Sequence, residues 1–141
     1  LHPRSHGLHS HPCPVKGESA YFCVRANSSG KSEIWKINYE SGVETCIVSD
    51  PSRNFTSPIL SPDGRWLLFV GESAIQGSGF TYRNTDLFVC HVDGTGFAQL
   101  TYHAADDLSP VWSKDGRFIY FISQRGSADG TANIWRMNFN Y

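Results

Sequence analysis

The stretch SPILSPDGRWLLFVG at Ser57–Gly71 occurs a second time as SPVWSKDGRFIYFIS at Ser109–Ser123. Both copies begin with Ser-Pro, pass through a short apolar step to an Asp-Gly-Arg turn, and end in five mostly apolar residues. Repetition of this kind is the sequence signature of repeat architectures, because each copy folds as one supersecondary unit. The chain therefore uses one structural unit more than once.

A second segment of the unit can be counted three times, as IWKIN at Ile34–Asn38, LFVCH at Leu87–His91 and IWRMN at Ile134–Asn138. The first and last of these copies are 100 positions apart, which gives about 50 residues per unit, close to the period of propeller blades. The first unit has a degenerate turn, Lys16-Gly17-Glu18, where the later copies have Asp-Gly. Three units are therefore expected.

The second unit predicts four strands in antiparallel order, with turns rich in Gly and Asp between them. The strands are expected at Pro58–Leu60, Trp66–Val70, Asp86–Val92 and Phe97–Thr101. Trp66–Val70 does not alternate between polar and apolar residues, which indicates that both faces of this strand are covered. We therefore expect an all-β chain of about three four-stranded antiparallel blades stacked face to face.

The composition describes an ordinary globular chain and excludes several classes of partner. The 141 residues are 40% hydrophobic and carry a net charge of −1, with Lys and Arg scattered singly. This pattern argues against a nucleic-acid groove or an anionic membrane surface as the main partner. No apolar run approaches the roughly 18 residues that span a bilayer, so membrane insertion is not expected.

The expected domain boundaries are a flexible His- and Pro-rich segment at 1–14, followed by three blades at about 15–49, 57–101 and 109–141. The third blade stops before the strand that would complete it. Closed propellers have four to eight blades, and an incomplete ring exposes apolar faces and a strand edge. We therefore expect either a homodimer that closes one ring from two copies or a fragment of a longer propeller.

The sequences SPDGRWLLFV, DLFVCHVDGTGFAQLT and SPVWSKDGRFIYFIS resemble the TolB-like β-propeller repeat, also described as a WD40-like PD40 repeat. The resemblance covers Ser57–Asn138 well and Ala20–Val48 more loosely. It implies that the three expected blades are half of a six-bladed ring. The third copy departs from the pattern by having Lys114 in place of Pro62.

The resemblance implies a non-catalytic scaffold that binds protein partners or ligands, without a cofactor, and an exported protein that is periplasmic or secreted. It also leaves an enzymatic alternative open. Similar blades form the gating propeller of prolyl-oligopeptidase-type peptidases and occur in oligogalacturonate lyase-like propellers that use metal-bound histidines. Fold alone does not decide between these functions.

The candidate binding site is the connection between the second and third blades, since ligands of propellers bind where such loops converge. It offers an aromatic ring, an imidazole and two carboxylates, from Tyr102, His103, Asp106 and Asp107. The connection at 49–54 is its counterpart between the first and second blades. The alternative is a solvated connection with no binding role.

Several other residues have structural interpretations. Asp63 and Asp115 are expected to form turns rather than to act as catalytic carboxylates. Trp35, Phe88 and Trp135, at equivalent positions, are expected to pack between blades.

The histidines and cysteines do not predict a metal site. The clustered histidines are His2, His6, His9 and His11, in a Pro-rich segment without Cys or carboxylates at structural-zinc spacing. The four cysteines show no CxxC pair and are expected to be small buried hydrophobes. They are Cys13, Cys23, Cys46 and Cys90. A Cys23–Cys46 disulfide is the alternative in an oxidising compartment.

Overall fold

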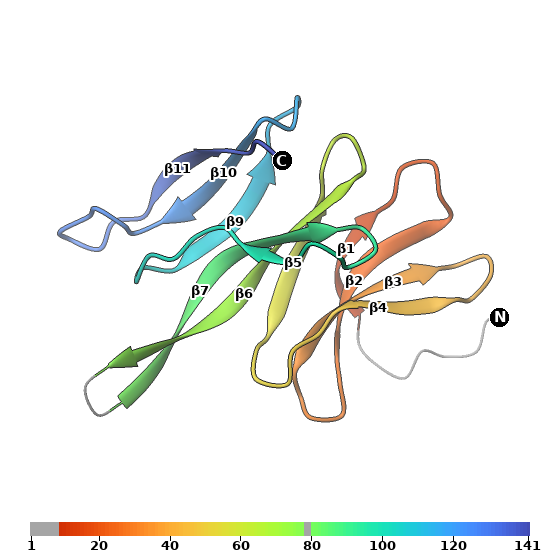
Figure 1. The fold of residues 1–141 in the computed structure, drawn as a ribbon, viewed down its shortest axis with the longest axis horizontal. Helices are drawn as coiled ribbons and strands as arrows, with labels where there is room; N and C mark the ends of the chain where they lie inside the picture. Colours follow the sequence, from red (N-terminus) through yellow and green to blue (C-terminus); the bar gives the residue numbers. More distant parts are fainter. Residues whose placement is uncertain (1–8, 78–79) are drawn as a thin grey trace.

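The computed structural model describes residues 9–77 and 80–141, and these form eleven strands in three antiparallel sheets (Figure 1). The first sheet contains β1 (His9–Pro14), β2 (Ala20–Ala26), β3 (Ser32–Asn38) and β4 (Glu44–Val48). The second contains β5 (Phe55–Leu60), β6 (Trp66–Gly77), β7 (Phe80–His91) and β8 (Ala98–Gln99). The third contains β9 (Asp107–Trp112), β10 (Phe118–Ser123) and β11 (Asn133–Asn138).

The predicted all-β blade architecture is confirmed, and the third sheet has three strands in the described part of the chain. Strands follow the chain order within each sheet, and the first strands lie next to one another, with β5 in contact with β1 and β9. No helix is present in residues 9–77 and 80–141, and thus none that is long and apolar enough to cross a membrane.

Residues 9–14 differ from the flexible segment that composition predicts for 1–14, because they form β1 and pair with β2. These residues share a feature with the first strand of the other two sheets. Each of the three strands contains a proline, and the residue before that proline has a positive φ angle. The φ angle is 53° at His11, 56° at Ser57 and 51° at Ser109. β1 therefore occupies the place of β5 and β9, while residues 1–8 lie outside the described residues.

The Asp-Gly turns have the structural role that the sequence predicts. Asp63 Oδ1 accepts hydrogen bonds from Ser61 Oγ (2.7 Å) and the Arg65 amide (3.1 Å). Asp115 Oδ1 makes the same two bonds in the third sheet, to a serine hydroxyl at 2.6 Å and the Arg117 amide at 3.0 Å. The glycine after each aspartate has a positive φ, 74° and 70°, which glycine adopts without steric cost.

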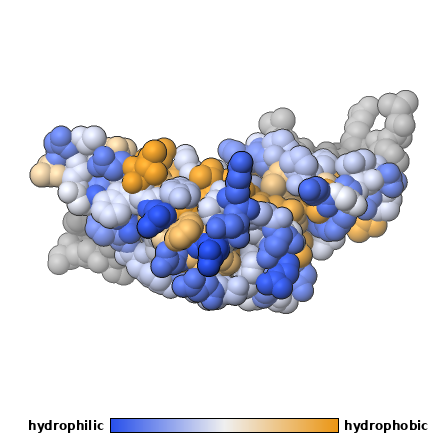
Figure 2. Space-filling model, turned by 90° about the horizontal axis from the view of Figure 1, so that it is seen from above, coloured by the Kyte–Doolittle hydropathy of each residue, from blue (hydrophilic) through white to orange (hydrophobic). Residues whose placement is uncertain are grey.

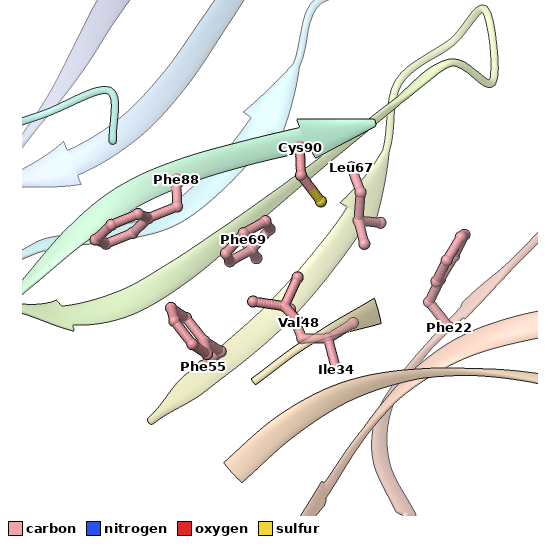
Figure 3. Close-up of a cluster of buried hydrophobic side chains, with 8 residues drawn as sticks. All are labelled: Phe22, Ile34, Val48, Phe55, Leu67, Phe69, Phe88 and Cys90. Atoms are coloured by element: carbon pink, nitrogen blue, oxygen red, sulfur yellow. The ribbon is translucent and has the colours of Figure 1, made fainter. Parts of the chain in front are cut away.

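The second sheet is buried on both faces, as the lack of alternation in β6 predicts. Leu67 and Phe69 face the first sheet, whereas Leu68 and Val70 face the third. The core between the first and second sheets consists of Phe22, Ile34, Val48, Phe55, Leu67, Phe69, Phe88 and Cys90 (Figure 3). The core between the second and third consists of Leu68, Val70, Leu87, Val89, Ile119, Phe121 and Phe139.

The three equivalent aromatic residues do not form one packing layer. Phe88 is fully buried, with its ring centroid 6.0 Å from that of Phe55. Trp35 is only half-buried, and the Arg25 guanidinium lies 3.6 Å from its ring centroid. Trp135 is 39% exposed. Trp135 pairs with Phe121 on the face of the third sheet that packs against the second sheet, so its exposure is not caused by a missing neighbouring blade.

None of the four cysteines forms a disulfide in the structure, so the alternative Cys23–Cys46 bridge is not formed. Cys23 and Cys90 are buried, as expected, and burial raises the pKa of Cys90 to about 12. Cys13 is half-buried and its Sγ accepts a hydrogen bond from the Leu60 amide at 3.4 Å. Cys46 is exposed, contrary to the expectation of burial, because β4 is the outer strand of its sheet.

Candidate functional site

The predicted binding loop connects β8 to β9 and places three of its four candidate residues, Tyr102, His103 and Asp106, at the surface. Tyr102 is 76% exposed, and its hydroxyl donates to the carbonyl of Gln99 at 3.1 Å. His103 is also exposed, and its Nδ1 accepts from the Ala105 amide at 3.0 Å. The loop is held against β7 because Asn84 Nδ2 donates to the His103 carbonyl at 2.8 Å.

Asp106 fixes the position of the same loop. Its Oδ1 accepts hydrogen bonds from the amide and the hydroxyl of Thr85, at 2.8 and 2.9 Å. These bonds use the carboxylate to join the loop to the second sheet. Asp106 is therefore a positioning group for the loop in this structure.

Asp107 is fully buried and not at the loop surface where the sequence places it. Its Oδ2 forms an ion pair with Arg125 Nη2, and its Oδ1 has no hydrogen-bond partner among the described residues. Asp107 is the first residue of β9, two positions before Ser-Pro, where β5 has the core residue Phe55. A charged residue thus occupies a core position of the repeat, and Arg125 neutralises it.

A second buried carboxylate lies close to this ion pair. Asp86 is 1% exposed, and hydrogen bonds from Thr101 Oγ1 (3.2 Å), Asn84 Nδ2 (3.2 Å) and Gln99 Nε2 (3.3 Å) reach its oxygens. Burial raises the pKa of Asp86, and the nearby charge of Asp107 raises it further. This network is not among the sites predicted from the sequence, although an acidic residue, Asp86, stands directly before the apolar run of β7.

The remaining candidate residues do not converge on a site. The connection at 49–54 is held locally, since Asp50 Oδ1 accepts from the amide and hydroxyl of Ser52 at 2.8 and 2.7 Å. His11 is exposed, His91 stacks on Trp66 at 3.9 Å, and His2 and His6 lie outside the described residues. Within the described ranges, no group of three or more metal-ligating side chains comes together.

Exposed apolar side chains lie together on the outer face of the third sheet. Ile122 pairs with Ile134 there, as Val70 pairs with Leu87 in the second sheet. Ile134 is 77% exposed, whereas Leu87 is 0% exposed. Positions that form the core in the second sheet are therefore open in the third.

This face, which we call the open face, is continuous. Leu108, Val111 and Ile122 on it are between 40% and 49% exposed. A groove of about 480 Å³ runs over Ser109, Val111, Tyr120, Phe121, Ile122 and Ile134. Figure 2 shows apolar side chains reaching the surface at the end of the molecule that carries this sheet. An apolar face of this kind typically marks an interaction surface.

No family model matches the chain, but curated relatives do. It is 33% identical over 91 residues to an uncharacterized protein of Agrobacterium fabrum, covering 64% of this chain and 28% of that protein. It is 35% identical over 90 residues to the Tol-Pal system protein TolB of Anaeromyxobacter dehalogenans, covering 63% of this chain and 18% of that protein. The chain thus spans less than a third of either relative.

Solved structures share the fold at low sequence identity. A protein of Agrobacterium tumefaciens assigned as TolB superposes with a TM-score of 0.73 and 20% identity, over 96% of this chain and 47% of that chain. The β-propeller domain of the trilobed protease of Pyrococcus furiosus gives 0.62 and 20%, over 94% and 39%. The tricorn protease gives 0.55 and 23%, over 74% and 10%. Together with the repeated Asp-Gly-Arg turn and the three stacked sheets, these matches show that the chain has a TolB-like β-propeller fold and is similar in sequence to TolB over 63% of its length.

Proposed function

We propose that the chain is a non-catalytic propeller scaffold that acts by binding protein. The observation that supports this function is the open face, where apolar residues stand at positions that are interior elsewhere in the repeat. The four candidate loop residues add a smaller surface, since Tyr102, His103 and Asp106 are exposed there and Asp107 is buried. Asp106 and Asp107 have structural roles, since Asp106 bonds to Thr85 and Asp107 pairs with Arg125.

We take the occupant of the open face to be a second copy of the chain, contributing its first sheet. The side chains on the open face are those that another blade covers in the second sheet, so a blade has the matching shape. Arg136 lies at the edge of this face, in the register position next to Ile134. The outer face of the first sheet carries Glu33 and Glu44 and one cation, Arg25, which pairs with Glu44, so the net negative charge left there is complementary to Arg136.

The test is the solution mass of the chain by light scattering coupled to size exclusion, for the wild type and for Ile134→Lys. We expect a dimer of about twice 15.7 kDa for the wild type and a monomer for the variant, because a charge at the centre of the interface would be desolvated without a partner. Val43→Lys is the matched control, since Val43 is 59% exposed but lies in the β3–β4 turn. If the wild type is monomeric at every protein concentration tested, the proposal that a second copy covers the open face is wrong.

A second candidate function is the propeller part of a peptidase. The propeller domain of the trilobed protease and the tricorn protease share the fold, and this observation favours the alternative over a lyase. Hydrolysis of a fluorogenic peptide library by the purified chain and by the product of the complete gene separates the two functions. Hydrolysis by the complete product alone favours the peptidase, and hydrolysis by neither favours the scaffold.

We also propose a periplasmic or secreted location, on the basis of the similarity to TolB. Cell fractionation with an antibody against the chain tests this location. Recovery in the cytoplasmic fraction, with a periplasmic marker correctly released, contradicts it.

A further inference from the structure

A cavity of about 200 Å³ lies between the Asp-Gly turns of the second and third sheets. Its aromatic wall is formed by Trp66, Trp112, Phe139 and Tyr141. Its other lining residues are Ser61, Asp63, Asp115, Gly116 and Arg117. Since none of these residues belongs to the open face or to the predicted loop, the cavity is a separate feature of the molecule.

The aromatic rings of the cavity meet at steep angles. The Phe139 centroid lies 5.5 Å from that of Trp66 and 4.8 Å from that of Trp112, both with interplanar angles of 83°. Tyr141 lies 4.9 Å from Phe139 with the rings inclined at 45°. Rings at such angles do not cover one another's faces completely. Part of each ring face is therefore exposed to the cavity. His91 stacks on the Trp66 ring, with the two ring centroids 3.9 Å apart.

The two carboxylates of the cavity, Asp63 and Asp115, differ in whether their second oxygen, Oδ2, already has a partner. Each uses Oδ1 for the hydrogen bonds of its own turn, which lower the pKa of both groups. Asp63 Oδ2 is paired with Arg65 Nε at 3.2 Å. Asp115 Oδ2 makes no hydrogen bond or ion pair within the described residues, and neither does the Arg117 guanidinium. An ionised carboxylate oxygen is therefore available beside an aromatic wall.

We propose that this cavity binds an organic ammonium group, with the cation against the aromatic rings and Asp115 Oδ2 as its counter-ion. Aromatic faces attract such cations through the ring quadrupole, and a cavity of this volume admits a trimethylammonium head or the end of a lysine side chain. Arg117 is the one cation of the lining set and opposes binding. The site thus has one charge that favours the ligand and one that disfavours it.

The experiment is an NMR titration of the full chain at about pH 8, following the indole N–H signals of its four tryptophans. Choline is the probe, and 3,3-dimethylbutanol, which has the same shape without the charge, is the control. We expect choline to shift the signals of Trp66 and Trp112 in a saturable way and to leave Trp35 and Trp135, which lie outside the cavity, unchanged. The neutral alcohol should bind at least about threefold more weakly.

Two variants that keep the turn intact test the charges. Asp115→Asn keeps an Oδ1 acceptor for the turn, and we expect it to weaken choline binding about threefold or more; Arg117→Gln should strengthen it. Asp93→Asn, in a similar turn whose Oδ1 accepts from Thr95, is the matched control and should change nothing. Equal binding of alcohol and choline, no saturable shift, or no effect of Asp115→Asn overturns the proposal.

The source of the ammonium group is distinguished by a second titration, with N-acetyl-lysine methylamide. Tighter binding of the lysine amide than of choline indicates a side chain of a partner peptide as the ligand. Tighter binding of choline indicates a free quaternary amine. Either order supports an ammonium site.

Discussion

The ion pair between Asp107 and Arg125 gives a prediction whose size follows from burial. The side chain of Asp107 is 0% exposed and that of Arg125 is 21% exposed. Replacing Arg125 by Met keeps apolar contact with the Phe121 ring, which lies 5.0 Å from the guanidinium, but leaves the carboxylate without its charge partner. Loss of one partner of a buried pair costs about 3–5 kcal/mol. Because Arg125 is partly exposed, we expect about 3 kcal/mol for Arg125→Met.

The double variant Asp107→Leu/Arg125→Met should recover most of this loss. The equivalent position in the second sheet is the core residue Phe55, so an apolar side chain suits this site of the repeat. Replacement of a buried pair by apolar residues is often neutral or stabilising, and we expect the double variant to lie within about 1 kcal/mol of the wild type.

The assay is urea unfolding followed by tryptophan fluorescence and circular dichroism, with the free energy of unfolding from linear extrapolation. Arg65→Met is the control, since Arg65 is 70% exposed and its pair with Asp63 is at the surface, where such pairs contribute less than about 1 kcal/mol. A loss below about 1 kcal/mol for Arg125→Met, or a double variant no better than the single one, refutes the reasoning that the pair is desolvated.

Three further predictions concern single positions in the interior. Gly71→Ala should destabilise the chain by about 1–3 kcal/mol in urea unfolding, because an added Cβ would lie 2.8 Å from two phenylalanine rings; an unchanged midpoint contradicts this. Iodoacetamide should modify Cys46, which is exposed, well before Cys90, whose pKa is about 12, as read by mass spectrometry. Faster labelling of Cys90 would show that the blade interface opens. The folded-state pKa of Asp86 is raised, so folding favours its protonated form. The free energy of unfolding of the wild type, relative to Asp86→Asn, should therefore rise as the pH falls from neutral toward the ordinary aspartate range, and a flat difference contradicts it.

The fold could be predicted from the sequence because the repeat is carried by local signals. The Asp-Gly turns and the apolar run of β6 indicate hairpins and a strand covered on both faces, and both are found. β1 could not be predicted from composition, because its residues are poor strand formers. Its place is fixed by pairing with β2 and by His11-Pro12, which corresponds to Ser57-Pro58.

The candidate site was less predictable, because the residue type at a loop position does not show whether its side chain faces solvent or bonds within the protein. Asp106 and Asp107 are neighbours in sequence, yet one bonds to Thr85 and the other is buried against Arg125. The partner Arg125 is 18 positions away and carries no local signal. The cavity between the turns was also missed, since it joins two turns that each have a sufficient structural role of their own.

The burial of both faces of β6 has a consequence for how the blade finds its alignment. In an amphipathic strand, a slip of one residue exposes apolar side chains and buries polar ones, which penalises the error. In Trp66–Val70, a slip would only exchange one set of apolar side chains for another. The correct register of β6 is therefore set by two features that do not tolerate a shift. One is the Asp63 turn before the strand, and the other is Gly71, which packs against the Phe55 ring. The information that specifies the most buried strand of the molecule thus lies at its two ends, in residues that contribute little to the core.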